Sequence, residues 1–251
     1  MVKENFTFGN SFIHKLDPKT RIIAVTILSF GAVFCDNFFV SGVFCIISSV
    51  LIVMAKLKIK DVFQRIKPLF WFLLMIWIII PITFEGVLLY EFYWFKISFN
   101  GLILCSQITI KSITILLFFT TLIATMNVAS LGNGLHKLYV PDKMVFLLLM
   151  SYRYISVIED EYKKLLRAAK FRGFKPGTNL HSYKTFAWLA GMLFVRASLR
   201  AQRVYQSMLC RGFNQKFHML DVYDAGRFNM IFLFCIIFTG LSLVILELIL
   251  C

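Results

Sequence analysis

Residues 229–250 read NMIFLFCIIFTGLSLVILELIL, an apolar run with a single charged side chain, Glu247. A transmembrane helix needs about 20 mostly apolar residues to cross a hydrocarbon core about 30 Å thick. Four further apolar runs occupy residues 22–35, 38–55, 68–84 and 101–126. We therefore predict an all-α membrane protein with about five transmembrane helices. The first two runs are separated by Asp36-Asn37, which we interpret as a tight turn on the outer side of the membrane.

The composition of the whole chain agrees with a lipid environment. Of its 251 residues, 59% are hydrophobic and only 16% are charged, whereas about 25% are charged in a typical soluble domain. The formal net charge of +14 is compatible with nucleic-acid binding, with anionic lipid, or with cytoplasmic loops that collect Lys and Arg. The apolar content favours the last, so we expect the lipid bilayer, and no nucleic acid, as a partner.

The distribution of cations predicts the orientation of the chain. Lys15, Lys19 and Arg21 flank the first run and five cations lie in 56–67, whereas 85–100 contains only Lys96. By the positive-inside rule, the N-terminus, the 56–67 loop and the segment after about 127 are cytoplasmic. We see no cleavable signal peptide in the polar residues 1–21. Asp17-Pro18 is typical of a helix start, because Asp caps free N–H groups and Pro suits the first helical position.

We divide the chain into transmembrane helices at 1–126, a basic cytoplasmic region at 127–228 and a last transmembrane helix at 229–251. Between Arg153 and Lys216 there are 13 Lys or Arg but only three acids. Apolar residues at helical spacing predict one short helix at about 128–138 and two long ones. The first long helix ends at Gly173 and contains a favourable Glu159–Lys163 pair, and the second covers about 182–211.

The two long helices end alike. Phe171-Arg172-Gly173 and Cys210-Arg211-Gly212 are each followed by Phe. A cation is favourable at a helix C-terminus, and Gly at the next position can adopt positive φ and end the helix. A single copy is adequately explained by an Arg that serves its own helix. The repetition favours two protruding, basic, aromatic-tipped ends that fit grooves on a paired partner, where Arg can bond to carboxylates.

A second basic feature supports a polar partner face. Arg196, Arg200 and Arg203 recur at i, i+4 and i+7 on the second long helix. The alternative is a face exposed to water or to lipid headgroups. The other side carries Trp188, Met192, Val195 and Leu199, which we expect to pack on the membrane bundle or on the other long helix.

The sequence offers little chemistry of its own. It has no G-x-x-x-x-G-K-[S/T] loop, no H-E-x-x-H motif and no C-x-x-C pair, so we predict no catalytic residues, no metal site and no disulfide framework. Contiguous acids at 159–161 point in different directions, which argues against a membrane enzyme. Lys111 is the clearest intramembrane charge; it is a functional candidate, or it snorkels, or it pairs with Glu85 or Glu91. One such residue and no inverted repeat argue against a self-sufficient secondary transporter.

Several of these residues together resemble one family. They are Leu16-Asp17-Pro18-Lys19-Thr20-Arg21, Ser151-Tyr152-Arg153-Tyr154, Glu161 and the two Arg-Gly-Phe ends. The chain resembles the T component of energy-coupling factor transporters, the transmembrane coupling subunit of a class of ABC importers. Residues 191–213 look most like the cobalt-type version, CbiQ.

The resemblance implies a non-catalytic coupling subunit in the cytoplasmic membrane of a bacterium or archaeon. Its two X-Arg-X motifs, Phe171-Arg172-Gly173 and Cys210-Arg211-Gly212, would insert into grooves on two ATP-binding cassette ATPase subunits. A separate S component in the membrane would bind the substrate. ATP and Mg²⁺ would be held by the partners, so no cofactor is expected in this chain. Cobalt is the expected substrate, with nickel or a vitamin as the alternative.

Overall fold

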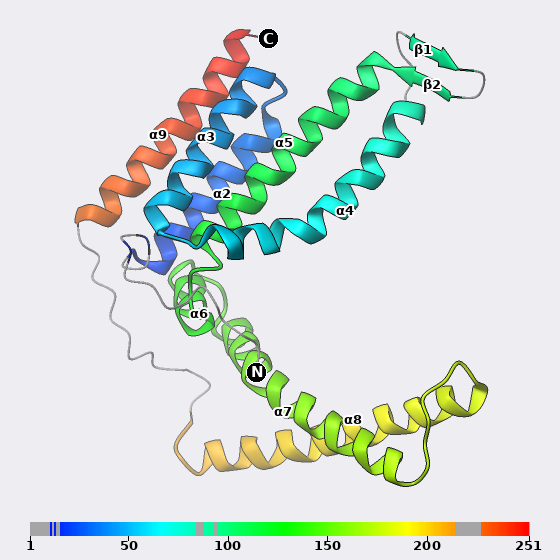
Figure 1. Cartoon of the computed structure of the whole chain (residues 1–251). Coiled ribbons are helices and arrows are strands. Elements are labelled where there is room, and N and C mark those ends of the chain that lie inside the picture. Colours follow the sequence, from blue (N-terminus) through cyan, green and yellow to red (C-terminus); the bar gives the residue numbers. More distant parts are fainter. Residues whose placement is uncertain are drawn as a thin grey trace. The chain divides into compact units, whose positions relative to one another are not determined.

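The computed structural model describes residues 11, 13, 16–83, 88–92, 95–213 and 227–250. In chain order its elements are α2 (Pro18–Phe34), α3 (Phe38–Ala55), α4 (Ile59–Thr83), β1 (Leu88–Phe92), β2 (Phe95–Ser98), α5 (Phe99–Leu122), α6 (Val128–Lys137), α7 (Asp142–Phe171), α8 (Leu180–Leu209) and α9 (Arg227–Leu250) (Figure 1). The predicted all-α membrane architecture is confirmed. The antiparallel β1–β2 hairpin between α4 and α5 was not predicted.

The chain divides into two compact units. One contains Leu135–Leu220, and the other contains Glu4–Gly134 together with Asp221–Cys251. The boundary therefore falls inside α6, a few residues beyond the sequence-based boundary at 127. We refer to them as the coupling unit and the membrane unit.

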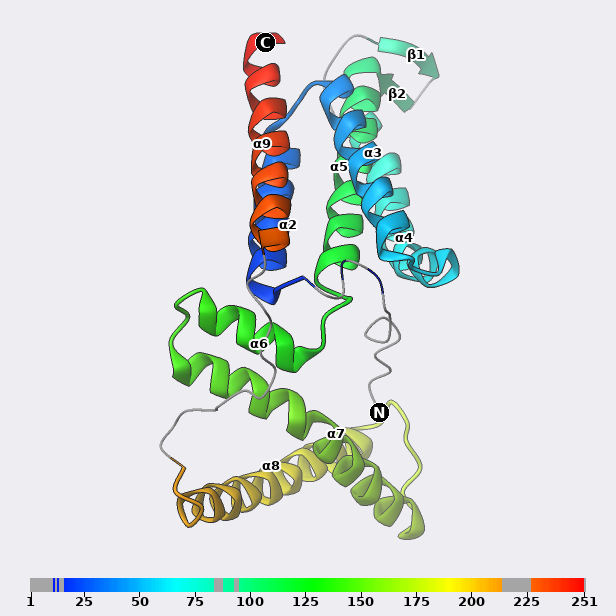
Figure 2. The same ribbon diagram turned by 90° about the vertical axis from the view of Figure 1, so that its left-hand side faces the viewer.

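The membrane unit is a helix bundle built around α5 and α2. Helix α5 packs against α2, α3 and α4, and α9 packs against α2 (Figures 1 and 2). Among the residues that the structure describes, three helices of this unit are long and apolar enough to cross a bilayer, over Ile59–Thr83, Phe99–Leu122 and Phe228–Glu247. Helices α2 and α3 have 17 and 18 residues, which gives them lengths of about 25–27 Å. Both are shorter than the three candidates, so the described residues support three of the about five predicted crossings and the other two stay a prediction.

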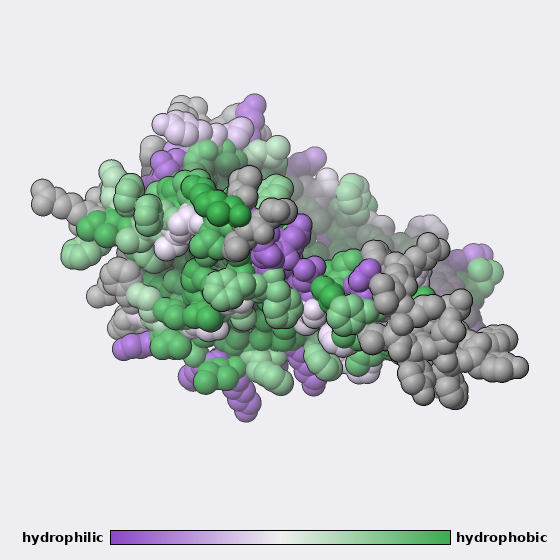
Figure 3. All heavy atoms as spheres, turned by 90° about the horizontal axis from the view of Figure 1, so that it is seen from above, coloured by the Kyte–Doolittle hydropathy of each residue, from purple (hydrophilic) through white to green (hydrophobic). Residues whose placement is uncertain are grey.

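Apolar side chains dominate the surface of this unit as well as its core. Helix α4 alone exposes Phe63, Phe70, Trp71 and Phe72, and hydrophobic atoms (green) cover much of the face drawn in Figure 3. Such a surface is expected where lipid, rather than water, is the solvent. The core contains Val25, Leu28, Val40, Phe44, Phe118 and Leu122, all fully buried.

Small residues allow the helices to approach one another. A Cβ on Gly31 of α2 would lie 3.2 Å from the Phe44 ring of α3, and one on Gly240 of α9 would lie 3.4 Å from Ile27 of α2. Association between membrane helices relies on such close packing, because lipid gives no hydrophobic drive toward it.

The start of α2 follows the sequence-based expectation. Asp17 is the N-cap, Pro18 stands at the first helical position, and the hydroxyl of Thr20 donates to the Asp17 carbonyl at 2.6 Å. Asp17 and Pro18 are buried, and Lys19 and Thr20 are partly exposed.

The predicted turn at Asp36-Asn37 is present and is held by two charged side chains. Glu247 of α9 accepts from the backbone N–H groups of Asp36 and Asn37, both at 2.8 Å. Lys111 of α5 donates to the Asp36 carboxylate at 2.8 Å. Lys111 therefore pairs with Asp36, whereas Glu85 and the side chain of Glu91, the partners considered from the sequence, lie outside the described residues. Pairing of this kind compensates the cost of placing an ionised group within a membrane segment.

Helix α4 begins earlier than its apolar run. The run was predicted at 68–84, but α4 starts at Ile59 and contains Pro68 and Pro81. Proline removes a backbone donor and its ring clashes with the preceding turn, which bends a helix rather than always ending it. Figure 1 shows that α4 is bent, and in its sequence Lys60, Arg65 and Lys67 all precede Pro68.

Helix α6 is seated against the start of α2 through Gly134. A Cβ on Gly134 would lie 2.8 Å from the Ile22 side chain, 2.9 Å from the Pro18 side chain and 3.1 Å from the Pro18 backbone. The backbone and the proline ring cannot move aside easily, so this contact requires glycine.

We expect Gly134→Ala to lower the stability of the detergent-solubilised protein by about 1–3 kcal/mol, the usual cost of overpacking. Gly42→Ala in α3 is the control, because a Cβ there would meet nothing within 4 Å. Thermal unfolding followed by loss of monodisperse protein measures both. Equal melting temperatures for the two variants would contradict the tight seat of α6.

Candidate functional site

The coupling unit is dominated by α7 and α8, two helices of 30 residues each. Phe146, Tyr154 and Ile158 from the first part of α7 line one hollow with Ala197 and Val204 from the second part of α8. A second hollow is lined by residues from the end of α7, including Ala169, and by Thr185 and Leu189 near the start of α8. The helices therefore pack antiparallel, and Figures 1 and 2 show them crossing.

Both helices end in the same hydrogen-bonded arrangement. In α7, Gly173 N–H donates to Lys170 and Phe174 N–H donates to Ala169, at 3.0 and 3.1 Å. In α8, Gly212 N–H donates to Leu209 and Phe213 N–H donates to Met208, at the same two distances. These pairs define a Schellman motif, with Gly173 at φ +84° and Gly212 at φ +75°. The predicted helix ends are confirmed.

The arginine of each motif is presented to the outside. Arg172 and Arg211 are both exposed, as are the residues before them, Phe171 and Cys210. Phe171 is 91% exposed, which is unusual for a ring of its size. Within the described part of the chain, neither guanidinium bonds to a carbonyl of its own helix, because backbone N–H groups already close the last turn. The arginines are therefore available to a partner.

The phenylalanine after each glycine does not point outward, contrary to our expectation of aromatic tips. Phe174 is only 9% exposed and packs edge-on against Phe186 of α8, with ring centroids 5.5 Å apart. Phe213 lies against Phe146 of α7 at 5.3 Å. A Schellman motif turns the residue after glycine back toward the helix, where it makes a hydrophobic contact. The end of each helix is thus fastened to the other helix.

The predicted basic face of α8 has partners inside the chain. Arg196 and Arg200 bond to opposite oxygens of Glu161 on α7, at 3.2 and 3.0 Å. Arg203 is exposed. The role of these three arginines toward a polar partner stays a prediction.

The orientation expected for α8 was wrong in one respect. Arg196 and Arg200 face α7, whereas Val195 and Leu199, which were expected to pack, are about half exposed. Trp188 and Met192 border the second hollow but remain largely exposed, at 79% and 51%. The two ion pairs of Glu161 turn the arginine face of α8 toward α7, although the apolar face was expected there. The hydropathy of α8 alone does not reveal this, because Glu161 lies on the other helix.

The predicted Glu159–Lys163 pair is present on the exposed side of α7. The hydrogen bond from Lys163 lowers the pKa of the Glu159 carboxyl and raises the pKa of Lys163. A lowered carboxyl pKa favours the folded state above the unfolded pKa, and this contribution disappears as the pH falls through the folded value. The pair joins two turns of one helix.

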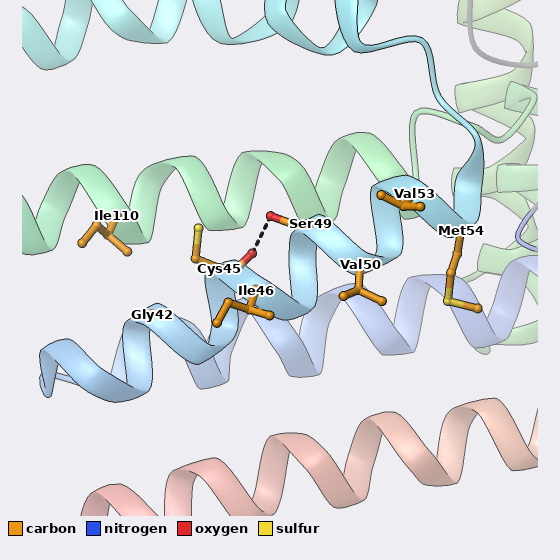
Figure 4. A pocket seen from close by; sticks show the side chains of 8 residues that line it. All are labelled: Gly42, Cys45, Ile46, Ser49, Val50, Val53, Met54 and Ile110. Carbon is orange, nitrogen blue, oxygen red and sulfur yellow. Dashed lines mark hydrogen bonds between the residues drawn. The ribbon is translucent and has the colours of Figure 1, made fainter.

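The membrane unit carries an open apolar groove along α3. It is lined by Gly42, Cys45, Ile46, Ser49, Val50, Val53 and Met54, with Ile110 of α5 (Figure 4). The Ser49 hydroxyl donates to the Cys45 carbonyl at 2.9 Å, so it is satisfied within the helix. A Cβ on Gly42 would meet nothing within 4 Å, which leaves the groove open at that point.

Metal-ligating side chains do not gather anywhere in the described residues: no group of three or more His, Cys, Asp or Glu is close enough to hold an ion. The site defined by the structure is instead a pair of exposed arginine-bearing helix ends. An exposed guanidinium can form two parallel hydrogen bonds to a carboxylate.

The sequence of the chain matches known membrane transport proteins. A family model described as cobalt transport protein (CbiQ) matches residues 9–219. The chain belongs to this family.

The curated relatives define the class further. An energy-coupling factor transporter transmembrane protein EcfT from Bacillus subtilis (strain 168) is 23% identical over 224 residues, covering 85% of this chain and 84% of its own length. EcfT proteins from Leuconostoc gelidum subsp. gasicomitatum and Listeria innocua are 27% and 26% identical, covering 83% and 85% of this chain and 82% and 84% of their own lengths. The resemblance stated from the sequence is confirmed.

We expect Gly173→Ala and Gly212→Ala each to destabilise the coupling unit by about 1–2 kcal/mol, the cost of a left-handed conformation for a residue with a Cβ. Steric clash does not contribute, because an added Cβ meets nothing within 4 Å at either position. Gly191→Ala in α8 has equally open surroundings without positive φ, and should be neutral or slightly stabilising. Limited proteolysis of the purified variants measures the difference. Identical cleavage of all three would argue against the glycine requirement.

Proposed function

We propose that this chain is the transmembrane coupling subunit, or T component, of an energy-coupling factor importer. The observation that carries the proposal is the matched pair of exposed arginines at identically closed helix ends. The family membership and the names of the curated relatives support it. The subunit is non-catalytic: it transmits the work of ATP hydrolysis and does not hydrolyse ATP itself.

In this function, Phe171-Arg172-Gly173 and Cys210-Arg211-Gly212 each dock into a groove of one of two ATP-binding cassette ATPase subunits. A guanidinium can form two parallel hydrogen bonds to a carboxylate, which gives direction as well as strength to the contact. ATP and Mg²⁺ are bound by the ATPase subunits. When these close on ATP, the displacement reaches the membrane unit through α7 and α8, since regular helices resist bending.

The membrane unit supplies the second docking surface, for a substrate-binding S component. The α3 groove is suited to a transmembrane helix, because Gly42, Cys45 and Ser49 are small and let another backbone approach. The substrate passes through the S component. Cobalt ions are the substrate we propose on the basis of the family, with nickel or a vitamin as the alternative.

The proposed orientation places the N-terminus and the coupling unit in the cytoplasm, in a bacterial or archaeal cytoplasmic membrane. It is supported by the 13 cations between Arg153 and Lys216 and by the cations of 56–67. This is the side on which ATP is available.

Replacing both arginines, Arg172→Ala with Arg211→Ala, should weaken the capture of ATPase subunits by about tenfold or more, as for anchor residues of an interface. Lys175→Ala with Lys184→Ala removes two exposed cations from the same unit without touching the tips, and should capture them normally. Co-purification in mild detergent and uptake of radioactive cobalt by cells measure the two properties. Undiminished assembly and uptake in the arginine variant would refute the proposal and favour a self-sufficient secondary transporter.

Cysteines introduced at Lys175 and Lys184 should resist a membrane-impermeant maleimide added to intact cells and react after the cells are opened. A cysteine at Asn100, the second residue of α5 and close to the β hairpin, is the control and should react from outside. Labelling of Lys175→Cys in intact cells would overturn the orientation.

A further inference from the structure

Glu161 occupies a special place between the two long helices. Its side chain is only 17% exposed, although it is charged. One carboxylate oxygen accepts from Arg196 at 3.2 Å and the other from Arg200 at 3.0 Å. We call this arrangement the Glu161 fork.

In the Glu161 fork, the favourable placement of each charged group depends on the other two. Arg196 and Arg200 are one helical turn apart on α8, where two like charges repel each other. Glu161 neutralises this repulsion from the other helix, and both of its oxygens are used. Loss of the carboxylate charge would leave two neighbouring cations facing α7.

The fork differs from the other contacts that hold α7 against α8. Toward either end of the pair the contacts are aromatic, Phe174 with Phe186 and Phe146 with Phe213. Such contacts tolerate a range of ring distances and angles. A carboxylate that bonds to two arginines tolerates much less displacement, because both N–H···O distances must be kept. The fork therefore fixes the register where the apolar contacts do not.

We propose that Glu161 is a positioning residue that sets the spacing of Arg172 and Arg211, so that the two arginines match two partner grooves at once. The match to two grooves rests on the proposed function, whereas the effect of Glu161 on the spacing of the two arginines does not. A helix rises 1.5 Å per residue, so slippage of α7 along α8 by a single residue would already displace one tip relative to the other by about that distance. Hydrogen bonds to a carboxylate do not survive such a shift.

The structural part is tested on the isolated full-length chain in detergent. Spin labels are attached to Cys210 and to a cysteine introduced at Lys175, both exposed, with the other cysteines replaced by Ala. Glu161→Gln should broaden the distance distribution between the labels about twofold or more, since a single amide cannot satisfy two cations. Glu159→Gln is the matched control: it removes the Glu159–Lys163 pair of the same helix without affecting α8.

Charge-reversal variants distinguish an effect of the charges in the Glu161 fork from an effect of side-chain shape. Glu161→Arg alone, and Arg196→Glu with Arg200→Glu, should both broaden the distribution. The triple variant that combines them recreates one arginine between two carboxylates and should restore it. An unchanged distribution in Glu161→Gln, or no restoration in the triple variant, would overturn the inference.

The functional part is tested in the assembled transporter. Glu161→Gln should reduce uptake per ATP hydrolysed about threefold to tenfold, which lies in the lower part of the range of coupling energies within one charge network, and the triple variant should recover it. Normal uptake in Glu161→Gln, despite a broadened distribution, would refute the role in transport. The label distances are measured without ATPase subunits, so they do not depend on the proposed function. If the Arg172 and Arg211 variants contradicted that function, the effect of Glu161 on the label distances would still stand.

Discussion

The backbone hydrogen bonds that close α7 and α8 are the constraint on which the candidate site depends. An α-helix leaves its last carbonyl groups unpaired, and some group must satisfy them. Here the N–H groups of Gly173 and Phe174, and of Gly212 and Phe213, do so. This requires positive φ at each glycine, which other residues adopt only at a cost. Because the backbone closes itself, each arginine is spared from capping its own helix and projects into solvent.

The membrane unit meets a related constraint with different groups. Backbone polar groups in a bilayer have no water to bond to. At the α2–α3 turn, the Glu247 carboxylate receives the two free N–H groups, and Lys111 pairs with Asp36. The single acid of α9 and the one cation within the α5 run are thereby explained by the same turn. Lys111 is accounted for as a structural tie and need not belong to a transport pathway.

Features set by local sequence were predictable here. Asp17-Pro18 marks the start of α2, Gly173 and Gly212 mark the ends of α7 and α8, and the length of an apolar run reveals a membrane helix. These signals depend on a few neighbouring residues and on known backbone preferences. The exposed Arg172 and Arg211 were found in this way.

Features set by distant contacts were missed. Nothing near Lys111 indicates Asp36, which is 75 positions away. The periodicity of α8 shows an arginine stripe, but not that Glu161 on another helix would turn it inward. Aromatic tips were expected because Phe follows glycine in both motifs, and the turn geometry that reverses the chain there was not considered. The apolar run was placed at 68–84, whereas α4 begins at Ile59 and contains Pro68 in its interior.

The two phenylalanines that follow the glycines have a mechanical consequence. Phe174 continues from the tip of α7 but rests on α8, and Phe213 continues from the tip of α8 but rests on α7. A pull on either arginine is therefore resisted by both helices from the first moment. The two helices should therefore bear a load applied at either end together, as one rigid body.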